Sequence, residues 1–251
     1  MIFVALFNIM ISSKNLVFIH GWGLSSKIFE PIIYRLKNDF KVYSLDLPGF
    51  GSSPIEKVMT LKDYANFVYE FLIKNQIVSL RDISRREKKP IIIGHSFGGA
   101  VATKLAILHP ESISKLILVS ASAVRRPHRK IIFIKKTADI LKPLLPKKIR
   151  KLILKILGYD KTDYAQIESS ELRETFKNVI KEDLKPHFHL IKTPTLVIWG
   201  EKDAVTPLSE GKLIAETISD AKFAVVKNAG HFLFLEKPEE FIKLIKEFTS
   251  S

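Results

Sequence analysis

The fold is decided by one stretch of the chain, Pro90-Ile91-Ile92-Ile93-Gly94-His95-Ser96-Phe97-Gly98. Its isoleucines are apolar on both faces, as in a central strand of a parallel sheet. The part from Gly94 to Gly98 matches G-x-S-x-G, a pattern that places a serine on a sharp turn between a strand and a helix. A helical pattern then runs from about Gly98 to Leu108. Ser96 is therefore predicted at a helix N-terminus, where the helix dipole favours a developing negative charge.

On both sides of this stretch, short β runs alternate with helical patterns. Such alternation is typical of an α/β fold, in which crossover helices cover a parallel sheet. Strands are expected at Asn15–Ile19, Phe40–Leu45, Leu116–Ser120, Thr195–Trp199 and Phe223–Val226. Amphipathic helices are expected at Phe29–Leu36, at Leu61–Leu72, from Pro207 onward and at Pro238–Phe248.

The composition excludes several classes of protein. With 251 residues and 46% hydrophobic side chains, the chain can bury a full core as one large domain or a domain with an insertion. Because cysteine is absent, disulfides, thiolate metal sites and cysteine nucleophiles are excluded, and a cytoplasmic location is expected. The pair His187 and His189 has no third ligand nearby, so neither a metal nor another cofactor is expected.

The apolar segment Met1 to Ile11 is too short for a membrane-spanning helix and lacks the basic start of a secretory signal. We interpret it as a buried first strand. Two alternatives stay open, a true start at Met10 and a weak membrane anchor.

Residues 123–193 interrupt the alternation and read as helices broken by prolines. We interpret them as a cap inserted into a core made of residues 1–122 and 194–251. Between Ala123 and Asp160 the sequence has twelve cations and two anions, so most of the net charge of +14 lies there. This basic stretch is either a solvated lysine-rich surface or a docking surface for an acidic partner, an acyl carrier protein or an anionic lipid. Nucleic acid is not expected, because no binding motif accompanies the charge.

A serine nucleophile needs a base and a third group that orients the base. Asp203 follows the expected strand Thr195–Trp199, and His231 follows the expected strand Phe223–Val226. The chain order Ser96, Asp203, His231 is the order expected for this architecture. We therefore predict these three as the catalytic residues, with Glu201 as the solvated carboxylate of the same loop.

The tetrahedral intermediate of such a reaction needs hydrogen-bond donors for its oxyanion. The backbone N–H of Phe97 is one candidate, and the N–H of Trp22 in His20-Gly21-Trp22-Gly23 is the second. The alternative for this loop is an ordinary glycine turn with Trp22 packed on the core. Substrate contacts are expected from Gly21, Trp22, His95 and Phe232.

These motifs together resemble the α/β-hydrolase fold serine hydrolases. The resemblance rests on His20-Gly21-Trp22-Gly23, Asp46-Leu47-Pro48-Gly49-Phe50-Gly51, the serine turn, Gly200-Glu201-Lys202-Asp203 and Gly230-His231. It implies a mostly parallel eight-stranded sheet, flanked by helices, with a helical cap between the sixth and seventh strands. It also implies that Asp46 supports a turn and takes no part in the chemistry.

The resemblance also narrows the reaction. Haloalkane dehalogenases and epoxide hydrolases of this fold use an aspartate nucleophile, whereas this chain has Ser96. We therefore expect a carboxylesterase for small to medium acyl esters. The sequence is similar to the pimeloyl-carrier-protein methyl ester esterase branch, although that branch has tryptophan at the position of His95. Lactonases and carbon–carbon bond hydrolases share much of the pattern and remain alternatives, as does a non-catalytic binding protein, although no triad residue is lost.

Overall fold

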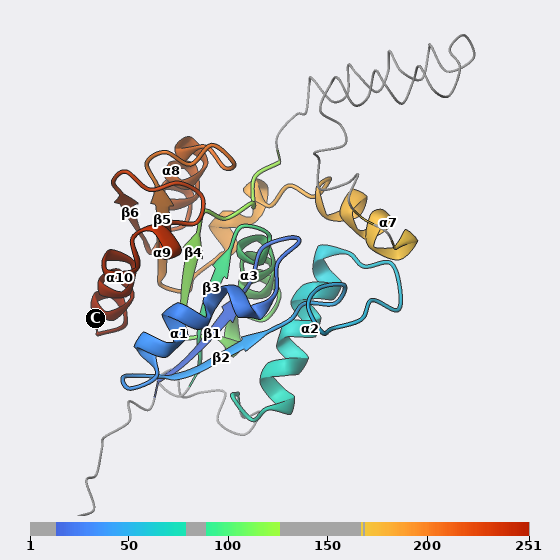
Figure 1. The fold of residues 1–251 in the computed structure, drawn as a ribbon. Helices are drawn as coiled ribbons and strands as arrows, with labels where there is room; N and C mark the ends of the chain where they lie inside the picture. The colour runs from blue at the N-terminus through green and yellow to red at the C-terminus, as the bar shows by residue number, and fades with distance from the viewer. Residues whose placement is uncertain (1–13, 79–88, 126–166, 168, 251) are drawn as a thin grey trace, which may run out of the picture.

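A computed structural model describes residues 14–78, 89–125, 167 and 169–250. Its centre is a six-stranded sheet in the order β2-β1-β3-β4-β5-β6, in which every neighbouring pair is parallel (Figure 1). The strands are β1 (Asn15–Ile19), β2 (Lys41–Leu45), β3 (Ile91–His95), β4 (Lys115–Val119), β5 (Thr195–Gly200) and β6 (Ala221–Val226). The predicted parallel α/β class is confirmed.

The strand count differs from the eight that the resemblance implied. The described residues contain six strands, and the strand expected at residues 1–11 lies outside them. The five flanking strands predicted from the sequence are all present: Asn15–Ile19 has the predicted ends, and the other four have an end shifted by one or two residues. Such shifts are ordinary, because residues at strand ends share the composition of the adjoining turns.

Helices cover both faces of the sheet. Those described are α1 (Glu30–Leu36), α2 (Leu61–Lys74), α3 (Phe97–Leu108), α7 (Ser170–Val179), α8 (Leu208–Thr217), α9 (Leu233–Glu236) and α10 (Pro238–Ser250). Three short 3₁₀ turns accompany them, η1 (Ser26–Phe29), η3 (Pro110–Ser112) and η5 (Lys185–Leu190). Helix α2 begins at a capping box, in which Thr60 and Asp63 each accept a hydrogen bond from the backbone N–H of the other.

Two apolar clusters form the core, one on each face of the sheet. Alternate strand residues enter opposite clusters: Ile92 packs with α2, α3 and α8, whereas Ile91 and Ile93 pack with α1, α9 and α10. This burial of both faces explains why the central strands are continuous apolar runs. In Figure 1 the two groups of helices lie on opposite sides of the strands.

The carboxyl ends of the parallel strands all lie at one edge of the sheet, where the functional loops therefore meet. Strand order reverses between β1 and β3, the place where ligands bind in open α/β sheets. The loop after β1 carries Trp22 and the turn after β3 carries Ser96. From the expected cap, the structure describes residues 123–125, 167 and 169–193, while most of the basic stretch falls outside the described residues.

Candidate active site

Ser96 stands on a strained turn between β3 and α3. Its φ is +52° and its ψ is −117°, a conformation that non-glycine residues rarely adopt. Its N–H donates to the carbonyl of Val119 at 3.0 Å, and its carbonyl accepts from the N–H of Ser122 at 2.9 Å. The turn also requires Gly98, because a Cβ there would lie 2.2 Å from the backbone oxygen of Ile19. The neighbouring backbone thus holds Ser96 in place.

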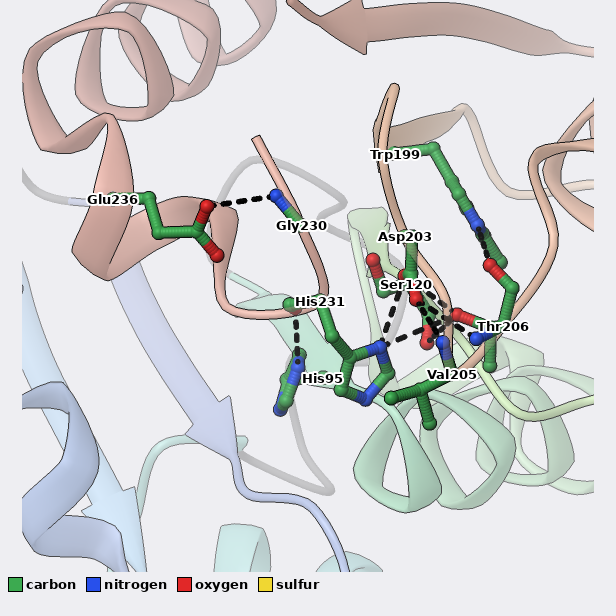
Figure 2. Close-up of polar contacts among 9 residues, drawn as sticks. All are labelled: His95, Ser120, Trp199, Asp203, Val205, Thr206, Gly230, His231 and Glu236. Atoms are coloured by element: carbon green, nitrogen blue, oxygen red, sulfur yellow. Dashed lines mark hydrogen bonds and ion pairs between the residues drawn. The ribbon is translucent and has the colours of Figure 1, made fainter. Parts of the chain in front are cut away.

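Asp203 and His231 form a buried pair at the ends of β5 and β6. Nδ1 of His231 lies 2.9 Å from Oδ2 of Asp203 (Figure 2). The other carboxylate oxygen accepts the N–H groups of Val205 and Thr206, each at 2.8 Å. Burial raises the pKa of Asp203, but the hydrogen bonds from His231 and Thr206 outweigh it and hold that pKa below its usual range. Asp203 therefore stays ionised and accepts the Nδ1 proton of His231, which leaves Nε2 as the ring nitrogen that can accept a proton.

Two glutamates brace the loops that carry this pair. Glu236 on α9 accepts the N–H of Gly230 at 2.8 Å, directly before His231 (Figure 2). Glu201 accepts the N–H of Asn228 at 2.9 Å and so ties the loop after β6 to the loop after β5. Glu201 therefore serves the backbone, while Asp203 faces the histidine.

His95 lies behind His231 and is 1% exposed. Its Nε2 donates to the carbonyl oxygen of His231 at 3.1 Å, and the two ring centroids are 4.8 Å apart. Burial, together with the nearby His231, lowers the pKa of His95 to about 3, so its ring is neutral. His95, which was expected to contact substrate, bonds to the backbone of His231 and is not among the residues that line the cavity described next.

An apolar cavity of about 270 Å³ opens beside Ser96. Trp22 and Phe97 line it together with Phe176 of α7, and the Trp22 ring packs against both phenylalanine rings at centroid distances of 5.1 and 4.9 Å. Val205, next to Thr206 at the Asp203 loop, lines the same cavity. The cavity thus brings together the serine turn, the expected oxyanion loop and the acid loop.

Trp22 and Phe97, whose backbone amides were expected as oxyanion donors, both line the cavity beside Ser96. Among the residues that the structure describes, neither amide has a hydrogen-bond acceptor. Among the described residues, no hydrogen bond joins Ser96 Oγ to His231. Gly21 and Phe232, which were expected to contact substrate, are not among the residues that line the cavity. Catalytic hydrogen bonds are often long without substrate, so the serine–histidine contact can form when the site is filled.

The sequence interpretation missed several residues of the site. Thr206 donates from Oγ1 to Asp203 at 2.7 Å and is 1% exposed, and Phe176 lines the cavity from a segment without a motif. The only signal for Thr206 was its place three residues after Asp203 in a loop at a strand end. In the part of the chain that the structure describes, no cluster of His, Asp and Glu could hold a metal ion. No helix in that part is long and apolar enough to cross a membrane.

Comparisons with known proteins show the family of the chain. The model of the alpha/beta hydrolase family matches residues 16–244. The chain belongs to the alpha/beta hydrolase family. This hydrolase is 32% identical to the pimeloyl-[acyl-carrier protein] methyl ester esterase of Wigglesworthia glossinidia brevipalpis, over 94% of this chain and 93% of the relative.

Two solved structures show the same fold. The hydrolase matches a hydrolase from Pseudomonas aeruginosa PA01 with a TM-score of 0.70 and 25% identity, over 95% of this chain and 90% of the other. It matches the enol-lactonase from Burkholderia xenovorans LB400 with a TM-score of 0.72 and 20% identity, over 95% and 92% of the two chains.

Proposed function

We propose that this alpha/beta hydrolase is a serine esterase that cleaves carboxylic esters through an acyl-enzyme. The observation that carries the proposal is the buried Asp203–His231 pair, joined at 2.9 Å, next to a cavity lined by Ser96. An ionised acid, an imidazole that the acid orients, and a serine that stands on a strained turn and lines the cavity are the parts that acyl transfer needs.

In the first step, Ser96 Oγ attacks the ester carbonyl while Nε2 of His231 takes the hydroxyl proton. Asp203 stabilises the resulting imidazolium, and the amides of Trp22 and Phe97 bind the oxyanion. His231 then gives the proton to the leaving alcohol. In the second step, a water molecule attacks the acyl-enzyme with His231 again as base, and the acid is released.

The cavity supports an acyl chain of small to medium length as the substrate group. Its lining includes the apolar side chains of Phe176, Val179 and Ile180, together with the charged Arg125 and Glu182. Helix α7, which carries Phe176 and Val179, is fastened over the core because Thr175 accepts the N–H of Met59 at 2.8 Å. These contacts support the assignment of residues 123–193 as a cap, although Leu184, Phe188 and Ile191 at its end pack in the core.

The similarity to a pimeloyl-[acyl-carrier protein] methyl ester esterase supports an ester presented by an acyl carrier protein. Such a carrier is acidic, and the excess of cations between residues 123 and 160 complements it. Hydrolysis of a carrier-linked methyl ester should then fall with rising salt, because salt screens the attraction. The hydrolysis of a free methyl ester of the same acid is the control.

The test is hydrolysis of p-nitrophenyl esters from C2 to C12 by wild type, Ser96→Ala and Ser114→Ala. Ser114 is the matched control, because its hydroxyl bonds to the carbonyl of Lys89 beside the amino end of β4. We expect Ser96→Ala to lose about a thousandfold or more of the rate, Ser114→Ala to keep it, and wild type to show a chain-length optimum. Failure of wild type on every ester would overturn the esterase assignment, and lactones and ring-cleavage diketones would be tried next.

A further inference from the structure

His20 is a fully buried polar residue that the reaction above does not use. Its Nε2 lies 3.0 Å from the backbone N–H of Leu47, which can only donate. Its Nδ1 lies 2.8 Å from the carbonyl oxygen of Gly21, which can only accept. The imidazole is therefore neutral with its proton on Nδ1, and both nitrogens are engaged.

The bond to Gly21 has a consequence for Trp22. The Gly21 carbonyl and the Trp22 N–H belong to one peptide unit, which is planar, so their directions are linked. A hydrogen bond that fixes the carbonyl on one side fixes the N–H on the other. The N–H of Leu24 also donates to this carbonyl, at 3.3 Å, so two donors hold it.

The segment around Asp46 holds His20 in turn. Asp46 accepts the N–H of Ser26 at 2.7 Å and the N–H and hydroxyl of Ser52 at 2.8 and 2.9 Å. These contacts fix the turn from which the Leu47 N–H reaches His20. Two loops that are separate in the sequence are thus joined through one imidazole.

The N-terminus of α3 packs against the same loop. A Cβ at Gly98 would lie 2.5 Å from the backbone oxygen of His20, so the helix start touches the His20 backbone. The helix start that carries the Phe97 amide therefore packs against the loop that carries the Trp22 amide, and the Trp22 and Phe97 side chains line the cavity with Ser96. The direction of the Trp22 N–H decides whether the two donors converge on one oxygen.

We propose that His20 is a positioning residue, which links the Asp46–Leu47 turn to the Gly21–Trp22 peptide and so aims the Trp22 N–H at the oxyanion. The inference rests on the proposed serine chemistry and names the residue that sets its oxyanion hole. It predicts that His20 affects transition-state binding and leaves ground-state binding of the acyl chain unchanged.

The test compares three variants. His20→Asn keeps a donor at the position of Nδ1, His20→Gln places its amide at the position of Nε2, and His20→Leu keeps neither. His109→Leu is the control, because the ring of His109 likewise has polar partners, Asn66 at 3.0 Å and Glu111 at 3.6 Å, but follows the far end of α3. Urea unfolding of each variant shows which of them fold.

The first readout is ester hydrolysis. We expect His20→Leu and His20→Gln to lower kcat by about ten- to a hundredfold, approaching the loss of one oxyanion donor, with KM within about threefold of wild type. His20→Asn is expected to recover most of kcat. Equal activity of folded Asn and Gln variants, or parallel changes in kcat and KM, would overturn the inference.

The second readout is independent of the natural ester. An alkyl fluorophosphonate forms a bond from phosphorus to Ser96 Oγ, fluoride leaves, and His231 takes the serine proton, so the mass of the labelled protein gives the rate. We expect the same order of variants for labelling, with His109→Leu equal to wild type. Labelling of wild type without ester turnover would refute the esterase alone, whereas absence of labelling in wild type would overturn the inference too.

Discussion

The imidazole of His95 holds the backbone of His231, with Nε2 of one residue 3.1 Å from the carbonyl oxygen of the other. His95→Leu removes this donor and leaves a buried carbonyl without it, which costs about 1 to 3 kcal/mol of unfolding free energy. His95→Gln keeps an N–H donor and is expected to lose less. Urea unfolding measures both free energies, and equal losses in the two variants would show that the bond is unimportant.

The lowered pKa of His95 predicts a dependence of stability on pH. Burial first, and then the nearby His231, lower the pKa to about 3 in the folded protein, whereas an unfolded histidine has about 6.5. Below about pH 6.5, His95 therefore binds a proton in the unfolded state but not in the folded state. The stabilising contribution is complete above about pH 6.5 and is lost as the pH falls toward about 3, by up to about 1.4 kcal/mol per pH unit.

This dependence is measured by urea unfolding at a series of pH values in wild type and His95→Gln. The difference between the two free energies should change steadily across this window and stay constant above it. The titratable groups near His95 are His231, Asp203 and His20, which both proteins share, so their effects largely cancel in the difference. Parallel curves over the whole range would contradict a neutral His95.

The sequence predicted the elements that carry a period or a motif. Strand β3 and the turn at Ser96 were found because an apolar run and two glycines mark them, and Asp203 and His231 because each follows a strand. The bonds of His95, Thr206 and Glu201 were not predictable, since each joins a side chain to a loop far away in the sequence. Such contacts exist only once the sheet order brings the loops together.

The role of the Asp46 segment shows the same limit. The resemblance implied a turn there, and the structure has positive φ values of 91° at Gly49 and 57° at Gly51. The hydrogen bond from the Leu47 N–H to His20 cannot be predicted from the sequence, because a backbone N–H can donate whatever the side chain of its residue is. The cap was predicted only from a break in the alternation, and its contribution of Phe176 to the cavity has no motif at all.

Thr206 supports the charge of Asp203, and its removal should slow the reaction. Thr206→Val keeps the shape of the side chain but removes the 2.7 Å bond from Oγ1 to Oδ2 of Asp203. A hydrogen bond to a charged group contributes about 1.5 to 3 kcal/mol, so kcat should fall by about ten- to a hundredfold. Thr206→Ser retains the hydroxyl and should stay within a few-fold of wild type, as measured on the preferred p-nitrophenyl ester.

The control for replacing a threonine hydroxyl by a methyl group is Thr217→Val. Its Oγ1 bonds the carbonyl of Leu213 within α8, away from the site. This variant should leave kcat unchanged. A slow Thr206→Ser together with a slow Thr206→Val would show that packing at this position matters more than the bond.

Gly98 allows the start of α3 to touch the loop after β1, and Gly98→Ala should break this contact. A Cβ there would lie 2.2 and 2.5 Å from the backbone oxygens of Ile19 and His20, which cannot rotate away. The helix start would have to move, at a cost of about 3 kcal/mol or more, and the Phe97 amide would move with it. Gly230→Ala is the comparison, because its Cβ would meet only the end of the Glu236 side chain, at 3.1 Å. Urea unfolding should show a loss of unfolding free energy several times larger for Gly98→Ala than for Gly230→Ala. The kcat of Gly98→Ala should fall as well, because Ser96 and Phe97 lie on the displaced turn. Equal losses of unfolding free energy in the two variants would mean that the helix start can move without disturbing the sheet.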